Sequence, residues 1–277
     1  MVLLLFLVFI IAALAIARKS RPAGNKNGRS LIEDNRCIND SQQPELLQVA
    51  SYNIQTGKSL SGKRNIMASA ELIRALHVAG IQEVYAPSLL NLLGLGKPQT
   101  QSLADHGGFS YLFAATRRRW LREHRGNAVL SKLPVRDWRI TMLPDQSNKS
   151  FRNMTVLEVE WRNQRFHFIN THLHTKQGRE EQLRIVLEEF AKYPRAILLG
   201  DFNTRRSSKL LQNALRDVEI VDAIAAAGLD DDPNRNSSDR IDWILTKGFV
   251  VESGTYLEKG ISDHPFYQVN LRYSSDN

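Results

Sequence analysis

The sequence contains a single cysteine, Cys37, so no internal disulfide can form in this chain of 277 residues. Cysteine-rich zinc sites are absent as well, and the seven histidines include no helical His-x-x-x-His pair, which argues against zinc. We find no internal repeat. With 42% hydrophobic residues, the chain is long enough to bury one substantial core, and one catalytic domain preceded by a short leader is the simplest division.

Acidic residues are outnumbered, and the formal net charge is +8. Residues 18–40 contain six Lys or Arg against three acids, which leaves +5 for the remainder of the chain. This excess is a mild preference for anionic partners and indicates no single class of them.

Long apolar runs are missing except at the start, where residues 1–17 carry no charge and Arg18 and Lys19 follow at once. At about 1.5 Å per residue, such a helix would barely cross a hydrocarbon core. It is either a minimal membrane anchor or a secretory signal that could be cut after Ala17. An anchor would leave the catalytic domain on the cytoplasmic side, whereas a cleaved signal would export it. Basic residues are absent before the run, and this favours the anchor.

Beyond the leader, residues 18–45 are polar and are predicted to be a linker, and residues 46–277 are predicted to form the catalytic domain. Short strand-like segments dominate this domain, with a few helical patterns between them, the clearest over 178–193. We expect two packed β-sheets flanked by helices.

Polar residues recur at the predicted strand ends. The positions are Asn53, Glu83, His172, Asp201 with Asn203, Asp242, and Asp263 with His264. In "GDFNT", Asp201 and Asn203 are two positions apart and should point to one side if the strand continues through them. Each position also has a plain structural explanation, such as a turn or a surface charge. For the set to have no common function, all of these separate explanations would have to hold at the same time.

The chemical make-up of this set indicates a hard cation. Carboxylates and amides suit Mg²⁺ or Mn²⁺, which are held by one or two carboxylates, water and substrate phosphate. A histidine beside an aspartate can be oriented and kept protonated, which suits acid/base work or stabilisation of an anion.

The ordered motifs "SYNIQTG", "IQEV", "GNAVLSKLP", "INTHLHT", "ILLGDFNT", "RIDWIL" and "SDHP" resemble those of the endonuclease/exonuclease/phosphatase superfamily, the DNase I-like proteins. The resemblance covers residues 46 to 273. It implies a four-layer α/β sandwich, with two mainly antiparallel sheets packed together between helices. It also implies Mg²⁺-dependent hydrolysis of a phosphoester by water.

Matched motif by motif, the resemblance implies a role for each polar residue. Glu83 would be the principal metal ligand, with Asn53 beside it contacting metal-bound water or phosphate, and Asp263 would lie near the metal. Asp201 would orient or deprotonate the attacking water. Asn203 and His172 would bind the scissile phosphate. His264, paired with Asp242, would stabilise the transition state or transfer a proton.

The chain departs from the family pattern at two places. Gln55 stands where many nucleases of the family carry an acid, which puts one outer metal contact in doubt. His264 and Pro265 are adjacent, whereas the family usually has a residue between them. His174 receives no role from the resemblance, and we take it for a surface histidine.

Two features favour nucleic acid as the substrate: "RRRWLREHR" at 117–125 and "TRRSSK" at 204–209. A solvated basic loop is an equal explanation for them. The leader and the apolar stretch 88–96 favour a phospholipid phosphodiester, as in a sphingomyelinase. A third hypothesis, from another class, is a catalytically silent phosphate-binding module. The presence of all the main motif residues argues against it.

Overall fold

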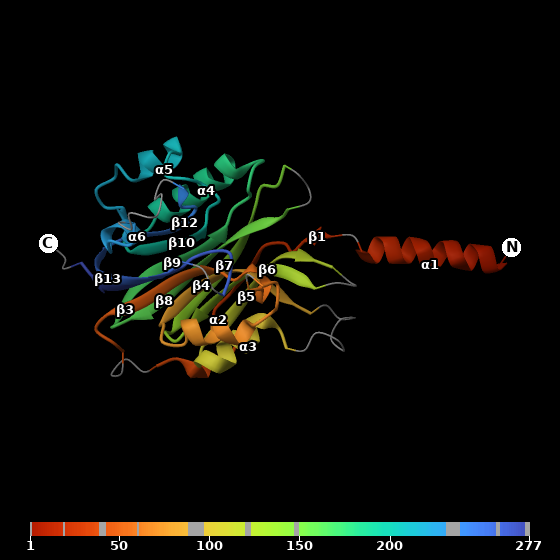
Figure 1. The fold of residues 1–277 in the computed structure, drawn as a ribbon, viewed down its shortest axis with the longest axis horizontal. Helices are drawn as coiled ribbons and strands as arrows, with labels where there is room; N and C mark the ends of the chain where they lie inside the picture. Colours follow the sequence, from red (N-terminus) through yellow and green to blue (C-terminus); the bar gives the residue numbers. More distant parts are fainter. Residues whose placement is uncertain are drawn as a thin grey trace.

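The computed structural model describes residues 2–18, 20–38, 43–59, 61–87, 97–119, 123–146, 150–230, 239–258 and 261–274. Two seven-stranded sheets lie face to face and helices cover their outer sides, so the expected four-layer α/β sandwich is confirmed (Figure 1). Trp120 and Arg122 of the basic motif at 117–125, and the whole apolar stretch 88–96, lie outside the described residues.

The first sheet consists, in spatial order, of β1 (Arg21–Pro22), β5 (Ser110–Arg118), β6 (His124–Ser131), β4 (Val78–Ala86), β3 (Leu47–Asn53), β14 (Phe266–Tyr273) and β13 (Phe249–Leu257). The second consists of β11 (Val221–Asp222), β12 (Asp242–Lys247), β10 (Ala196–Asp201), β9 (Gln164–His172), β8 (Arg152–Trp161), β7 (Val135–Leu143) and β2 (Lys26–Gly28). Only the central pairs β3/β4 and β9/β10 are parallel among these described pairs. Parallel neighbours bring the ends of their strands to the same edge of a sheet.

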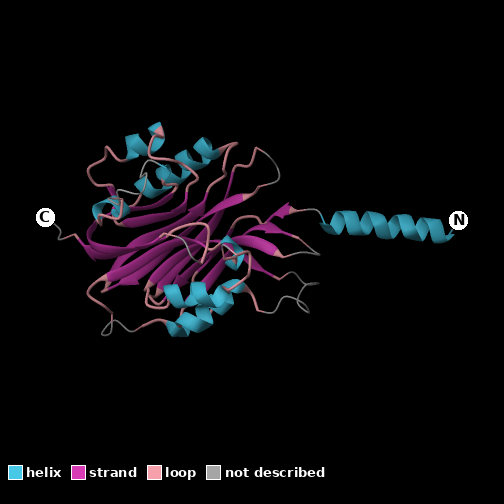
Figure 2. Cartoon of the chain, viewed as in Figure 1, coloured by secondary structure: helices cyan, strands magenta, loops and turns pink. Residues whose placement is uncertain are grey.

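Helices α2 (Ile66–Ile73) and α3 (Gln99–Gly107) pack on the first sheet, and α4 (Arg179–Ala191) and α5 (Lys209–Ala214) pack on the second (Figure 2). The short α6 (Ala223–Ala226) contributes Ala223 and Ile224 to the core between the sheets. Strand alternation divides the apolar residues among three layers. In β3, Leu47 and Val49 face the other sheet, whereas Ala50 and Tyr52 face the helices. Polar residues that continue an inward row beyond the core therefore meet at the mouth between the sheets.

The N-terminal helix α1 (Val2–Arg18) projects away from the sandwich (Figure 1). Its apolar side chains from Leu5 to Ile11 are exposed, with Phe9 at 71%. In the part of the chain that the structure describes, no helix combines the length and the apolar character needed to cross a membrane.

Residues 18–45, predicted to be a polar linker, contribute to the sandwich instead. β1 pairs with β5, β2 pairs with β7, and Ile32 bridges to Tyr111. Leu31 is buried in the core between the sheets. The segment adds an edge strand to each sheet, because strand edges offer free N–H and C=O groups to any extended neighbour. The polar composition of the segment gave no indication of this strand pairing.

Candidate active site

Three neighbouring strands of the second sheet end in one row of polar side chains. Asp201, at the end of β10, lies opposite His172 of β9 on one side and Asp242 of β12 on the other. The inward row of each strand contains apolar core residues, namely Leu199 in β10, Phe168 in β9 and Ile244 in β12, although in β9 the polar Asn170 stands between Phe168 and His172. The same alternation that builds the core therefore turns all three polar groups toward the first sheet.

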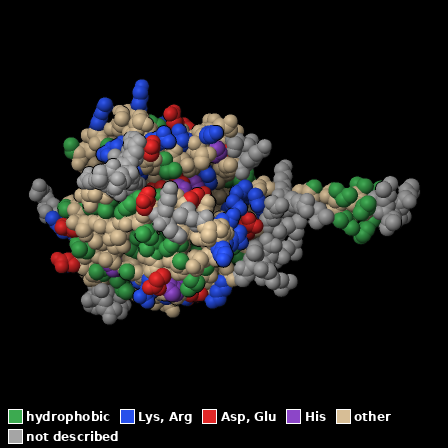
Figure 3. All heavy atoms as spheres, in the orientation of Figure 1, with side chains coloured by type: hydrophobic (Ala, Val, Ile, Leu, Met, Phe, Trp, Pro, Cys, Tyr) green, Lys and Arg blue, Asp and Glu red, His purple; other side chains and the backbone are tan. Residues whose placement is uncertain are grey.

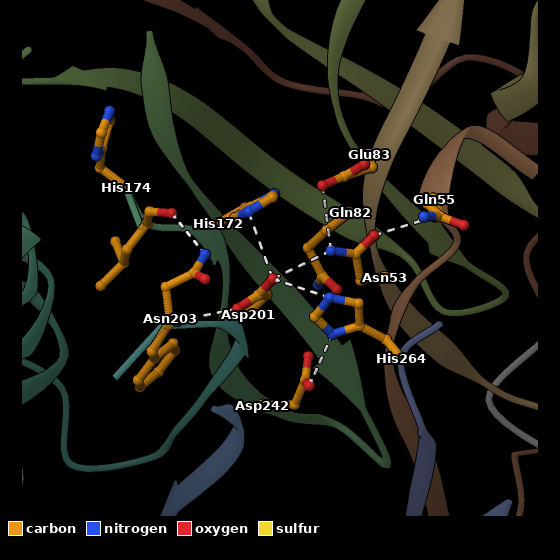
Figure 4. A network of polar contacts seen from close by, with 12 residues as sticks. Asn53, Gln55, Gln82, Glu83, His172, His174, Asp201, Asn203, Asp242 and His264 are labelled. Atoms are coloured by element: carbon orange, nitrogen blue, oxygen red, sulfur yellow. Dashed lines mark hydrogen bonds and ion pairs between the residues drawn. The ribbon is translucent and has the colours of Figure 1, made fainter. Parts of the chain in front are cut away.

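Asn53 reaches this row from the first sheet (Figure 4). It ends β3 on the inward face and is buried. Its Nδ2 lies 3.1 Å from Oδ2 of Asp201 and 3.5 Å from Oε1 of Glu83. Asn53 thus links the two sheets and holds two carboxylates to one amide.

Glu83 owes its position to an irregularity in β4. The pairing of β4 with β6 shifts between Ile81 and Val84, and both of these residues pack against the helices. Simple alternation would turn Glu83 toward the helices as well. The bulge and a left-handed backbone at Glu83 (φ 57°) aim the carboxylate at Asn53 instead. Bulges that re-aim a side chain are frequent next to active sites.

His264 lies between two carboxylates. Its Nδ1 is 3.0 Å from Oδ2 of Asp242, and its Nε2 is 3.6 Å from Oδ2 of Asp201. Ser262 fixes the loop before β14, because its hydroxyl donates to the backbone oxygen of Asn53 at 2.7 Å. The predicted pairing of His264 with Asp242 is present in the structure.

The two histidines of the site have opposite charge states. Burial lowers the pKa of His264, but the hydrogen bond and charge of Asp242, together with the charges of Asp201 and Asp263, outweigh this and raise the pKa to about 9. Burial, with the nearby charge of Arg152, holds the pKa of His172 well below its ordinary value. At neutral pH, His264 is a cation and His172 is neutral.

Asp201 is the carboxylate best placed to accept a proton. Burial raises its pKa, and the charge of Asp242 raises it further. His264 and the hydrogen bonds from Asn53 and the N–H of Asn203 only partly offset these effects. A raised carboxyl pKa brings a general base closer to working pH.

Asn203 differs from the expectation that it shares a strand face with Asp201. β10 ends at Asp201, and Asn203 has a left-handed backbone (φ 50°). Its N–H donates to Oδ1 of Asp201 at 2.9 Å, while its Nδ2 donates to the backbone oxygen of Leu173 at 3.0 Å. The second N–H of the amide has no partner among the described residues, and Asn203 lines a cleft of about 440 Å³ beside the site.

Asp263 and Gln55 meet at the exposed rim. Nε2 of Gln55 donates to Oδ2 of Asp263 at 2.8 Å, so an amide holds a carboxylate where a second acid would repel it. His174, which had no expected role, accepts the N–H of Lys176 on its Nδ1 at 3.0 Å.

Two places in the site suit a metal ion: a group of three residues, and the single carboxylate of Glu83. Asp201, Asp242 and His264 place ligand atoms within 4.8 Å of one another. A protonated His264 cannot ligate a cation, however, and its Nδ1 is already bonded to Asp242. Glu83 is a stronger candidate, because its carboxylate has no ion pair among the described residues and lines a cavity of about 170 Å³. The amide oxygen of Asn53 accepts the N–H of Gln55 at 3.1 Å, so Asn53 holds the carboxylates by its NH₂ group as oriented here.

Sequence reasoning missed a polar layer beneath the site. Nε2 of Gln82 donates to Oδ1 of Asn170 at 2.9 Å, which joins β4 to β9 across the core, and Nδ2 of Asn170 donates to the backbone oxygen of Ala128 at 2.9 Å. Arg152, half-buried at the start of β8 close to Glu83 and His172, was missed as well. A polar residue on the inward face of a strand is the signal for Gln82 and Asn170, whereas Arg152 alternates with the face of Met154 and Val156, which packs against the helices, and so gave no such signal.

The two basic motifs have different surroundings. Arg205 pairs with Asp239 at 3.3 Å, and Arg206 lies 3.8 Å from Asp230, so "TRRSSK" is largely neutralised by acids. Arg117, by contrast, has no ion pair among the described residues. Figure 3 shows Lys and Arg side chains gathered on the side of the sandwich that faces α1.

The fold places the chain in the class of α/β sandwiches with two packed sheets between helices. The family model of the Endonuclease/Exonuclease/phosphatase family matches residues 50–264, and the chain therefore belongs to that family. The family is largely hydrolytic, contains nucleases and phosphatases, and typically depends on a divalent metal. A search of curated proteins found no match.

Solved structures share the fold at low identity. An endonuclease/exonuclease/phosphatase from Beutenbergia cavernae is 20% identical, with a TM-score of 0.67, over 84% of this chain and 72% of that chain. A mannosyl-6-phosphatase from Bacteroides thetaiotaomicron is 19% identical, with a TM-score of 0.62, over 82% and 100%. D. rerio TDP2, complexed with single-strand DNA product, is 16% identical, with a TM-score of 0.61, over 83% and 100%.

Proposed function

We propose that this chain is a Mg²⁺-dependent phosphodiesterase that cleaves nucleic acid, with endonuclease-like action. The observation that carries the proposal is the arrangement around Asp201, which lies between a cationic His264 and a neutral His172 and is tied through Asn53 to Glu83. One network of polar contacts therefore joins a general base, a cationic histidine and a carboxylate suited to a metal ion (Figure 4). Three arginines that line the neighbouring cavity, Arg117, Arg125 and Arg152, favour a polyanionic substrate.

Glu83 would hold the metal ion, with water and substrate oxygens as the remaining ligands. When bound, a divalent cation neutralises charge on the phosphoryl oxygens. Mn²⁺ has the same ligand preference and would substitute for Mg²⁺.

The chain's own residues divide the remaining work. Asp201 orients the attacking water and accepts its proton, which its raised pKa favours. His264, kept protonated by Asp242, stabilises the negative charge that develops on the phosphoryl oxygens. His172 and the second amide N–H of Asn203 contact the scissile phosphate. Asp263 and Gln55 border the entrance near the metal.

The test is nicking of supercoiled plasmid in Mg²⁺ and in EDTA. Wild type should nick only with metal, and Glu83→Ala and Asp201→Asn should lose at least about 100-fold in rate while remaining folded. Glu71→Ala, which removes a carboxylate on the outer surface of α2, is the matched control and should nick normally. Near-normal nicking by Asp201→Asn would show that its assigned role is wrong.

The second candidate is a phospholipid phosphodiesterase of the sphingomyelinase type, favoured by the exposed apolar side chains of α1. We also propose that α1 holds the protein at a membrane with the catalytic domain on the cytoplasmic side; export after cleavage of the leader is the alternative. Metal-dependent release of a phospholipid head group, with no plasmid nicking, would replace nucleic acid with lipid. Phosphate binding without any turnover would indicate a silent binding module.

A further inference from the structure

A group of three arginines lies directly beside the catalytic residues. Glu83 and His172 line one part of the cavity of about 170 Å³, and Arg117, Arg125 and Arg152 line another. They come from β5, β6 and β8, so both sheets contribute to this wall. None of the three is needed for the chemistry assigned to Asp201 and His264.

These arginines are poorly neutralised. Arg117 makes no side-chain hydrogen bond or ion pair among the described residues, and Nε of Arg152 is buried without a partner. Arg125 has a single contact, at 3.5 Å, with Glu123. Burial lowers the pKa of Arg117 to about 10, and the charges of Arg119, Arg125 and Arg152 contribute. The three guanidinium groups share this cavity with one carboxylate, Glu83, so positive charge is in excess and favours an anion between them.

The backbone places two of these charges face to face. Arg117 and Arg125 are cross-strand partners in β5 and β6, next to a register shift between Ala115 and Arg117. Like charges directly opposite one another destabilise a sheet, so this arginine pair destabilises the first sheet unless an anion lies between the two side chains.

The local structure around the shift is firmly held. Nδ2 of Asn153 donates to the backbone oxygens of both Ala114 and Ala115 at 3.0 Å, and Nδ2 of Asn127 donates to Oδ1 of Asn153 at 3.0 Å. Gly126 is required here, because a Cβ at this position would lie 2.1 Å from the backbone oxygen of Ala114. The arginines therefore stand on a rigid wall, which suits recognition of a defined group.

We propose that Arg117, Arg125 and Arg152 form a subsite for a second phosphate of the substrate, next to the scissile phosphate along a nucleic-acid strand. This inference rests on the proposed function, since it assigns the cleaved phosphate to the catalytic residues. Guanidinium groups match phosphate oxygens with two parallel hydrogen bonds. The cationic choline of a phosphocholine head group would be repelled by the same wall.

The test uses substrates with one defined scissile bond. These are thymidine 5′-(p-nitrophenyl phosphate), with and without a 3′-phosphate, and the reversed 3′-ester, with and without a 5′-phosphate. Water attacks phosphorus and p-nitrophenolate leaves, so the released p-nitrophenol reports cleavage. Wild type should show a KM about tenfold lower when the second phosphate is present, in at least one polarity.

Variants then locate the effect. Arg117→Gln should reduce the KM advantage to about onefold, and Arg117→Lys should keep part of it. Arg118→Gln is the matched control, because Arg118 is the exposed next residue of β5 and lines a different pocket, and it should retain the full advantage. Equal KM values for both substrates in wild type, or an unchanged advantage in Arg117→Gln, would overturn the subsite while leaving the proposed function intact.

Absence of cleavage of every ester would instead count against the proposed function, and calorimetry then tests the subsite alone. Inorganic pyrophosphate, titrated into the full chain in EDTA, should bind wild type and Arg118→Gln equally and Arg117→Gln at least about fivefold more weakly. Equal binding to all three proteins, or no binding, would overturn the inference.

Discussion

The amide of Asn53 and the carboxylate of Asp201, 148 positions apart in the chain, join the two sheets by a hydrogen bond of 3.1 Å. Each residue lies at the end of a central strand, on the face that packs the core between the sheets. Assembly of the site is therefore coupled to packing of the sandwich. A slip of one residue in either strand would turn its polar group toward the helices.

Replacing Asn53 should affect stability and activity together. In Asn53→Ala, Asp201 and Glu83 lose their shared donor in a buried place, so the free energy of unfolding should fall by about 1–3 kcal/mol and turnover by at least about tenfold. Denaturant unfolding and initial rates measure the two effects. Asn270→Ala, which removes an exposed amide bonded to Ser253, is the control and should change stability by less than about 0.5 kcal/mol. Equal losses in both variants would contradict the special role of Asn53.

Strand alternation made much of the site predictable. Asn53, His172 and Asp242 lie on the same inward rows as apolar core residues, and the structure brings them together as the motifs implied. The pairing of His264 with Asp242 followed from the resemblance to the family, and it is present at 3.0 Å.

Departures from regular strands were less predictable. Glu83 faces the site only because of the bulge in β4, and Asn203 leaves the strand with a left-handed backbone. Glutamate at position 83 gives no indication of a left-handed backbone, whereas asparagine adopts it more often than most residues, so the alternative that GDFNT forms a turn held the signal for Asn203. The edge strands within 18–45 were missed for another reason: backbone pairing satisfies polar segments as well as apolar ones.

Metal binding at Glu83 can be measured without turnover. Mg²⁺ at millimolar concentration should raise the Tm of wild type, because a ligand that binds only the folded state stabilises it. Glu83→Gln keeps the shape but removes the charge, so its Tm should not respond. Glu71→Gln should respond like wild type, since that carboxylate is on the outer surface. A full Mg²⁺ response in Glu83→Gln would move the metal to the group of Asp201, Asp242 and His264.

His77 should make stability depend on pH. Burial, followed by the charge of Lys132, lowers its pKa from 6.5 to about 4, and its Nδ1 accepts the N–H of Gln48 at 2.9 Å. Because the unfolded chain binds the proton more readily, the contribution of His77 to the free energy of unfolding is fully present above pH 6.5 and is lost as the pH falls toward 4. After a discount for partial exposure, the loss is about 2 kcal/mol. In His77→Asn, which keeps an acceptor but does not titrate, this part of the slope should disappear from unfolding curves at pH 4 to 7. An unchanged slope would contradict the assignment to His77.

The pH profile of activity should report the bond between Asp242 and His264. Burial lowers the pKa of His264, but the hydrogen bond and charge of Asp242 outweigh this effect and raise the pKa to about 9. If the protonated form is the active one, kcat should fall as the pH rises through about 9. In Asp242→Asn the negative charge is gone while the shape remains, so the basic limb should move to lower pH by at least about one unit, and kcat at pH 9 should fall at least about fivefold. Rates from pH 5 to 10 with a substrate of fixed charge measure the shift. Asp239→Asn, which removes an exposed carboxylate that pairs with Arg205, is the control and should leave the limb in place. A basic limb that stays at the same pH in Asp242→Asn would mean that Asp242 does not hold the proton on His264, and the cationic role of this histidine would have to be abandoned.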